Sequence, residues 1–175
     1  MTCRRLALAV IALVTAASGA TAIAQPAPTA MSSDWAQALC KAWNNDKTLT
    51  EQLAASGWAG NHGGRGMKAM QIFRSDCPAS ARVELHIVLK DGLAQCIHGG
   101  APQDGKLDPA SDYLMWADTA RWREMGNGDY GPMRAMAFGR LNFSGPKLEA
   151  MSNMGPFEGF LLLVGQVPGD WTTCP

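Results

Sequence analysis

The sequence predicts an α+β fold, in which a mainly antiparallel sheet packs against helices from both ends of the chain. Residues 81–98 alternate apolar and polar side chains around a hairpin signal. Residues 111–145 have the pattern strand, helix, Gly/Pro turn, helix and strand. Helical spacing of apolar residues occurs before the first of these segments and after the second. Together with a further strand after Met67, these patterns indicate five strands with helices around them.

Residues 1–24 have the pattern of a secretory signal peptide. Two arginines precede an uncharged apolar segment from Leu6 to Val14, and Ala22-Ile23-Ala24 fits a small-x-small cleavage site. We therefore expect an exported protein, periplasmic or secreted, after cleavage near Ala24. An uncleaved membrane anchor is the alternative, because residues 6–33 carry no charge.

The rest of the chain is slightly acidic and has the length of one domain. Without residues 1–24, 13 of the 15 basic residues remain against 15 acidic ones, which gives 151 residues a net charge of −2. A basic face for nucleic acid is not expected. We expect a helical segment with a glycine-rich linker over 25–66, the main domain over 67–167 and a tail over 168–175.

Two short helices are predicted within residues 25–66. Ser33-Asp34 can cap the first, whose apolar face includes Trp35 and Leu39, and Thr48 can cap the second. The segment 58–66, WAGNHGGRG, has no G-K-[ST] ending and no preceding strand, so we interpret it as a linker rather than a phosphate loop.

Three antiparallel strands are expected next. The first lies in KAMQIFR after Met67, the second covers residues 81–90, and the third runs from Leu93 to His98 before a polar loop at 99–109. Asp91-Gly92 between the second and third is a strong hairpin signal. His86 falls on the polar face of its strand, where a solvated histidine is expected.

The cysteines predict two disulfides. In an oxidising compartment the even count favours bridges, and without a C-x-x-C motif a metal site is disfavoured. Of the five cysteines, Cys3 lies in the predicted leader. The other four allow three pairings, and these four are Cys40, Cys77, Cys96 and Cys174.

The hairpin register ranks these pairings. A two-residue turn at Asp91-Gly92 places Ile87 opposite Cys96, on the apolar face where helices must pack. Cys77 then lies too far along the sheet to reach Cys96. We therefore expect Cys40 to pair with Cys96 and Cys77 to pair with Cys174.

The segment 111–145 and the residues after it supply the remaining elements. Tyr113 to Trp116 is predicted as a strand, and Asp118-Thr119 as the cap of a helix. The turn from Gly126 to Pro132 precedes a second helix and a strand at 141–143. Pro146 fits the first turn of a final helix, which Gly155-Pro156 should interrupt.

No catalytic or metal-binding pattern is evident. The sequence lacks a G-x-S-x-G elbow, an H-E-x-x-H motif and a paired-histidine metal site, and its three histidines lie in one predicted loop and two predicted strands. We therefore expect a protein that is not an enzyme and needs no metal or cofactor.

From Ala81 to about Leu163 the chain resembles the sterol carrier protein 2 family of lipid-binding domains. The most specific match is GDYGPM at 128–133 followed by AMAFGRLNFSG at 135–145. LKDG at 89–92, ASD at 110–112 and the helix start at Asp118-Thr119 also match. Pro146 replaces the usual Asp, and the leader, the cysteines and residues 25–66 have no counterpart in the family pattern.

The resemblance implies an α+β domain in which helices cover one face of a five-stranded, mainly antiparallel sheet and enclose an apolar tunnel. It also implies a lipid ligand, such as a sterol, a hopanoid, a quinone or a fatty acyl lipid, that is held without being transformed. Methionine adapts to irregular spaces, so the dense methionines after residue 111 indicate either loose core packing, which their spacing favours, or a cavity wall, which the resemblance favours. The candidate cavity residues are Val83, Leu85, Ile87, Met125, Met133, Met136, Phe138, Leu141, Phe143, Leu148, Met151, Met154, Phe157 and Phe160.

The expected function is therefore an exported lipid-binding or lipid-transfer protein that contacts membranes transiently. A first alternative is an accessory protein or enzyme that presents a hydrophobic substrate from the same pocket, which would require an inward-facing polar group. A second alternative is an interaction module, for which exposure of the apolar run 160–164 would be the evidence.

Overall fold

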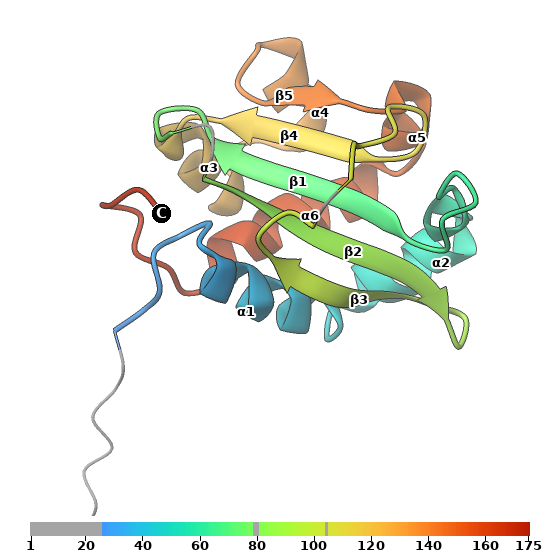
Figure 1. Ribbon diagram of the computed structural model, residues 1–175. Coiled ribbons are helices and arrows are strands. Elements are labelled where there is room, and N and C mark those ends of the chain that lie inside the picture. Colours follow the sequence, from blue (N-terminus) through green and yellow to red (C-terminus); the bar gives the residue numbers. More distant parts are fainter. Residues whose placement is uncertain (1–25, 79–80, 104) are drawn as a thin grey trace, which may run out of the picture.

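The computed structural model describes residues 26–78, 81–103 and 105–175 (Figure 1). The predicted signal peptide lies outside the described residues. Within them, no helix combines the length and the apolar character needed to cross a bilayer.

A five-stranded sheet in the order β3-β2-β1-β4-β5 forms the centre of the molecule. Its strands are β1 (Lys68–Arg74), β2 (Arg82–Lys90), β3 (Leu93–Gly100), β4 (Tyr113–Ala117) and β5 (Asn142–Ser144). The central pair β1–β4 is parallel, and the other three pairs are antiparallel. The α+β class and the mainly antiparallel sheet are confirmed.

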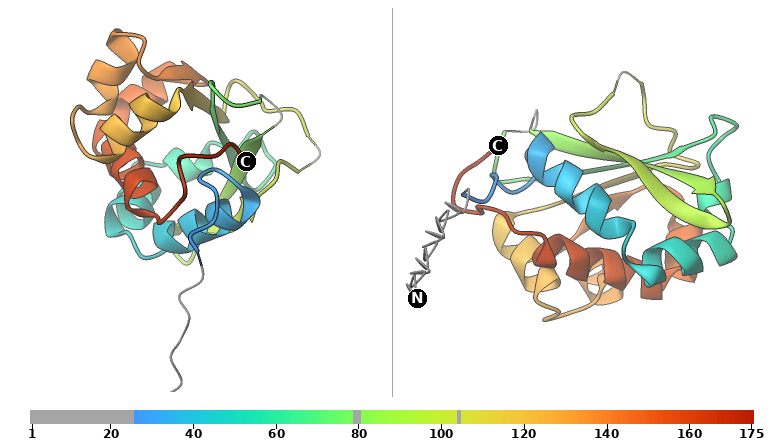
Figure 2. Two further views of the ribbon diagram at one scale, coloured as in Figure 1. Left: turned by 90° about the vertical axis from the view of Figure 1, so that its left-hand side faces the viewer. Right: turned by 90° about the horizontal axis from the view of Figure 1, so that it is seen from below.

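Helices lie on one side of this sheet, as the right-hand view of Figure 2 shows. The α-helices are α1 (Ser33–Trp43), α2 (Leu53–Ala55), α3 (Thr119–Gly126), α4 (Pro132–Ala137), α5 (Lys147–Ser152) and α6 (Met154–Gln166). A π-helical turn, η1 (Thr48–Gln52), and a 3₁₀ turn, η2 (Trp58–Gly60), connect α1 to β1. On the other side, the loop between β3 and β4 rises over the sheet.

The hairpin between β2 and β3 has the predicted register. Asp91 and Gly92 both have positive φ, 52° and 74°, as a two-residue hairpin turn of this hand requires. Ile87 pairs with Cys96. This places Cys96 against α1, where it forms a disulfide with Cys40.

The second disulfide joins Cys77 to Cys174. It fastens the C-terminal tail beside the end of β1. Both predicted pairings are confirmed. The first was expected from the strand register, and the second was the pairing that remained.

One hydrophobic core runs between the sheet and the helices, and it includes buried side chains from Met31 to Val167. The apolar phase of β2, represented by Val83, Leu85 and Ile87, faces this core. Helix α1 contributes Trp35 and Leu39 from its predicted face. The segment before β1 is therefore packed into the same core as the sheet.

Several element boundaries differ from the sequence expectations. Ser32, one residue before the expected cap, accepts the Trp35 amide at the start of α1. At η1 the Leu49 amide is bound by the carboxylate of Asp46 and not by Thr48. The expected interruption of the last helix falls at Asn153, between α5 and α6, because proline is tolerated in the first turn of α6.

The apolar run at 160–164 lies inside α6. Phe160, Leu161 and Val164 are each at most 2 % exposed. The run is therefore part of the core, contrary to what the interaction-module alternative required.

Candidate functional site

An open apolar groove of about 400 Å³ lies between α4, β5 and α5. These elements lie together along the top edge of Figure 1. The groove is lined by Met133, Met136, Ala137, Gly139, Leu141, Asn142, Phe143, Lys147, Ala150 and Met151. Apart from Asn142 and Lys147, its walls are apolar side chains and glycine.

Turns on both sides of β5 shape this groove. Gly139 ends α4 with φ of 66°, a conformation that glycine adopts without strain. Gly145 has φ of 145°, and a Cβ placed there would clash with the Asp112 carbonyl oxygen. Only glycine lets the chain pass so close to β4 before it turns into α5.

A small apolar cavity of about 20 Å³ lies between the sheet and α6. Its volume suits about one water molecule and is too small for a lipid chain. It is lined by Trp43, Leu49, Leu53, Trp58, Met70, Tyr113, Ala150, Asn153, Pro156, Phe157 and Phe160.

A thin partition separates the cavity from the groove. Ala150 of α5 lines both spaces. The Phe143 ring, on the groove side, lies 4.8 Å from the Tyr113 ring and 6.0 Å from the Phe157 ring, which line the cavity. Movement of Phe143 or of α5 would therefore join the two spaces.

A buried ion pair connects α5 to β1 beside the cavity. Lys68, whose side chain is fully buried, donates from Nζ to Oε1 of Glu149 at 2.5 Å. The same Nζ lies 4.5 Å from the centre of the Trp58 ring and 5.0 Å from that of Tyr113. Tyr113 and Asn61 also donate to the Glu149 carboxylate. Glu149 thus links its helix to a strand and a loop.

The electrostatics of this cluster follow from its burial. Burial lowers the pKa of the Lys68 ammonium, and the hydrogen bond and charge of Glu149 oppose that shift. Burial also raises the pKa of the Tyr113 hydroxyl, which remains a neutral donor to Glu149. The cluster therefore has balanced charges and filled hydrogen-bonding positions.

Among the solved structures that resemble this chain, two match its architecture along most of its length. The first is the solution structure of TT1886, a conserved hypothetical protein from Thermus thermophilus described as possibly a sterol carrier protein. It has a TM-score of 0.51 and 21 % identity, and the match covers 84 % of this chain and 97 % of that one. The second is a crystal structure of sterol carrier protein 2, with a TM-score of 0.51, 22 % identity, and coverage of 78 % and 98 %.

This chain has the sterol carrier protein 2 fold. The expected resemblance is confirmed at the level of fold, and the alignment extends beyond residues 81–163 that carried it. No protein-family model and no curated protein matches the chain.

Within the sterol carrier protein 2 fold, the candidate cavity residues fall into three groups. Five of them line the groove: Met133, Met136, Leu141, Phe143 and Met151. Two line the cavity: Phe157 and Phe160. The remaining seven line neither space: Val83, Leu85, Ile87, Met125, Phe138, Leu148 and Met154.

The seven outside both spaces differ in burial. Val83, Leu85, Ile87 and Met125 are buried core residues, and Met154 is half-buried. Phe138 and Leu148 are 71 % and 81 % exposed. Strand alternation and helical spacing mark apolar positions but do not separate core, wall and surface.

Sequence reasoning missed several residues of the site. Trp43, Trp58, Met70 and Tyr113 line the cavity, and Lys68 and Glu149 flank it. Lys68 carried a signal, because it lies in phase with Met70 and Ile72 on the apolar face of its strand. A charge in that phase needs a buried partner.

A second polar cluster, around His86 and Glu84, lies on the opposite face of the sheet. His86 is 5 % exposed and not solvated as expected, because the loop between β3 and β4 covers it. Its Nε2 lies 2.5 Å from Oε1 of Glu84, which also accepts the Gln103 amide of that loop. In the described ranges, no group of three or more His, Cys, Asp or Glu residues is placed to hold a metal.

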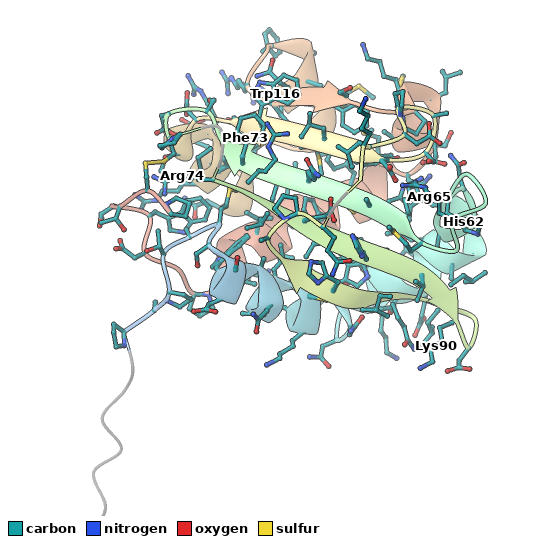
Figure 3. All side chains as sticks on the ribbon, in the orientation of Figure 1. His62, Arg65, Phe73, Arg74, Lys90 and Trp116 are labelled. Carbon is teal, nitrogen blue, oxygen red and sulfur yellow. A yellow bond between two sulfur atoms is a disulfide. The ribbon has the colours of Figure 1, made fainter. Side chains whose placement is uncertain are left out.

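The same face carries an aromatic pair near β4. The rings of Phe73 and Trp116 stack at 5.8 Å with an 8° interplanar angle (Figure 3). Arg65, labelled at the other end of the sheet, binds Asp112 at 2.6 Å. The segment 58–66, expected to be a plain linker, is therefore fastened to the start of β4.

Proposed function

We propose that this chain is an exported lipid-binding or lipid-transfer protein whose lipid enters through the groove between α4 and α5. The observation that carries the proposal is the apolar groove, which reaches a thin partition in front of the cavity. The sterol carrier protein 2 fold supports it. The lipid-binding unit spans residues 67–167, and the preceding helical segment completes its core.

Lipid entry requires a limited rearrangement. Helix α5 is the lid, because Ala150 separates the two spaces and Phe143 lies just before the helix. The Lys68–Glu149 pair holds the lid closed in the absence of lipid. Opening toward the groove and rotation of Phe143 would give an acyl chain, a hopanoid, a sterol or a quinone a continuous apolar path.

The energetics suit a ligand that is held and later released. Burying about 400 Å² of apolar lipid surface contributes roughly 10 kcal/mol by transfer from water. Association and ordering of the lid offset part of this gain. The net affinity therefore allows exchange with a donor or acceptor membrane.

We favour holding over chemical transformation of the lipid. Tyr113 and Asn153 are polar residues of the cavity wall, as the substrate-presenting alternative required. However, Tyr113 accepts from Trp58 and donates to Glu149, and Asn153 donates to the Glu149 carbonyl. These groups are engaged in the fold, so we assign no catalytic residue.

Export is supported by the two disulfides, which form in oxidising compartments. N-terminal sequencing of the exported protein should begin at Gln25, directly after the predicted cleavage site at Ala24. A protein that retains residues 1–24 after export would contradict the cleaved-leader proposal.

Native mass spectrometry after incubation with a fatty acid, a sterol and a quinone tests the proposed function. We expect a one-to-one complex with at least one of them, and Met136→Glu should abolish it, because a carboxylate in the groove wall opposes an apolar chain. Leu89→Glu is the control, since Leu89 is 53 % exposed at the end of β2, away from the groove.

Two outcomes would contradict the proposal. One is failure of the folded wild-type protein to load any of the three lipids. The other is equal loading of the Met136→Glu and wild-type proteins. Circular dichroism of both variants verifies that lost loading is not lost folding.

A further inference from the structure

Exposed apolar side chains gather around the groove. Six large hydrophobic residues are exposed in the described part of the chain, and four of them lie within residues 133–151. These four are Met133 at 51 %, Phe138 at 71 %, Leu148 at 81 % and Met151 at 51 % exposure. Clustered exposed apolar residues of this kind mark interaction surfaces.

Basic side chains accompany this apolar cluster. Arg134, Arg140 and Lys147 belong to the same segment, and the first and last are exposed. We call these three cations and the four exposed apolar residues the α4–α5 face. The region is positive although residues 25–175 carry a net charge of −2.

Acidic groups offset this charge only in part, because Glu124 interacts with Arg140 but is itself bound by Arg121. Between residues 132 and 153 the sequence contains one acidic residue, Glu149, whose carboxylate points inward to Lys68. Glu158 of α6 lies beside Gly131, ahead of the N-terminal end of α4. The outward charge of the α4–α5 face is therefore basic.

We propose that the α4–α5 face docks on the surface of a bilayer that contains anionic lipids. Exposed apolar side chains flanked by arginine and lysine suit the boundary between headgroups and acyl chains. A second copy of the chain fits less well. A twofold interface would set the three cations of one face against the same three cations of the other.

Docking in this orientation gives the groove a function. The groove lies inside the face, so its opening would meet the bilayer and a lipid could pass into it without crossing water. This part of the inference rests on the proposed lipid-binding function. The docking itself does not require a bound lipid.

Vesicle co-sedimentation of the purified protein tests the docking. We expect binding to phosphatidylcholine vesicles that contain phosphatidylglycerol, weaker binding without phosphatidylglycerol, and a decrease with added salt. The double variant Phe138→Ser/Leu148→Ser should bind about tenfold more weakly, because both side chains lose their contact with the acyl region.

The matched control is the double variant Leu89→Ser/Ile97→Ser. It removes two side chains of 53 % and 60 % exposure from β2 and β3, at the edge of the sheet opposite β5. It should bind vesicles like the wild-type protein. Equal losses in the two variants, or no loss in Phe138→Ser/Leu148→Ser, would overturn the proposal.

Lipid loading distinguishes docking from the proposed function. Phe138 and Leu148 line neither the groove nor the cavity, so their double variant should still load lipid from solution. Loss of vesicle binding with retained loading supports the docking. Vesicle binding without lipid loading by any variant would overturn the proposed function and leave the docking proposal intact.

Dimer formation through the α4–α5 face without vesicle binding would overturn the docking proposal. It would show that a second copy of the chain, and not a membrane, covers this face.

Discussion

Lys68 is a fully buried cation on the apolar face of β1. Burying a charge is unfavourable unless a partner compensates it, and here Glu149 and the Trp58 and Tyr113 rings do so. The pair specifies where α5 sits on the sheet more than it adds stability, because two charges must be removed from water to form it.

Replacement of Lys68 by methionine should lower the free energy of unfolding by about 3 kcal/mol, because Glu149 keeps its charge without a cation. The estimate is at the low end of the range because Glu149 is 19 % exposed at its side chain. Urea unfolding measures the change.

The double variant Lys68→Met/Glu149→Gln provides the control for this prediction. It should recover much of the loss, because the glutamine removes the uncompensated charge and still accepts from Tyr113. A double variant no more stable than Lys68→Met would contradict the role of the pair.

Individual residues were predictable where a local pattern determines their environment. Alternation along β2 correctly placed His86 on the face away from the helices. It gave the wrong exposure because the covering loop begins more than ten residues later in the chain. Cavity residues such as Trp43 and Tyr113 come from distant elements, and their meeting depends on tertiary packing.

At the scale of elements, helices α3 and α6 pack closely where Gly126 of α3 meets Gly165 of α6. A Cβ on Gly165 would clash with the Gly126 carbonyl oxygen, and one on Gly126 would lie 2.6 Å from the Gly165 Cα. The two backbones are therefore in contact. This crossing positions α3 and the turn that leads to α4 and the groove.

Gly165→Ala should lower the free energy of unfolding by about 2 kcal/mol, because the added methyl group forces the two helices apart. Gly159→Ala in the interior of the same helix is the control. The atom nearest to its Cβ would be Thr48 Cγ2 at 3.4 Å, an ordinary van der Waals distance. Chemical unfolding of both variants should show opposite signs, since alanine has the higher helix propensity by about 1 kcal/mol. A neutral Gly165→Ala would contradict the close crossing.

The elements themselves were largely predictable from sequence. The β2–β3 hairpin was predicted correctly from its turn to the Ile87–Cys96 pair, because the turn fixes the register, but the bulge that shifts the pairing beyond Ile87 was not predicted. The parallel pairing of β1 with β4 was not, because no local signal selects a partner some forty residues away. The predicted position of the break between α5 and α6 was wrong by a few residues, because proline is tolerated in the first turn of a helix.

At the scale of the whole molecule, the disulfides join the helical layer and the tail to the sheet. Cys40–Cys96 closes a separation of 56 residues, and Cys77–Cys174 closes one of 97. Long closed segments restrict the unfolded chain and so raise stability. Arg74 also holds the tail near the Cys77–Cys174 disulfide, because its guanidinium donates to the Trp171 and Thr173 carbonyls.

Replacing Cys40 and Cys96 together by serine should lower the free energy of unfolding by about 4 kcal/mol on the chain-entropy account. The double variant of Cys77 and Cys174 should lose slightly more, because its segment is longer. Guanidinium unfolding of each variant measures the losses. Reductant should then destabilise the wild-type protein more than either variant, and an insensitive wild-type protein would contradict both bridges.

The global fold was accessible from sequence through the motif at 128–145, whose glycines and apolar residues fix turns and packing directions. The groove and the cavity were not. Their volumes depend on which rotamer Phe143 adopts and on a contact at Ala150, and residue spacing does not encode either of them.

The interleaved arrangement of the disulfides also sets an order of events during synthesis. Cys77 lies inside the segment closed by Cys40 and Cys96, and its own partner is made 78 residues after Cys96 (174 − 96). Because the N-terminal part of the chain is made first, the Cys40–Cys96 disulfide can form while Cys77 is still a free thiol. Premature capture of Cys77 by Cys40 or Cys96 would leave Cys174 without its partner. We therefore expect correct disulfide formation to require that the β2–β3 hairpin forms early and places Cys96 beside Cys40 of α1.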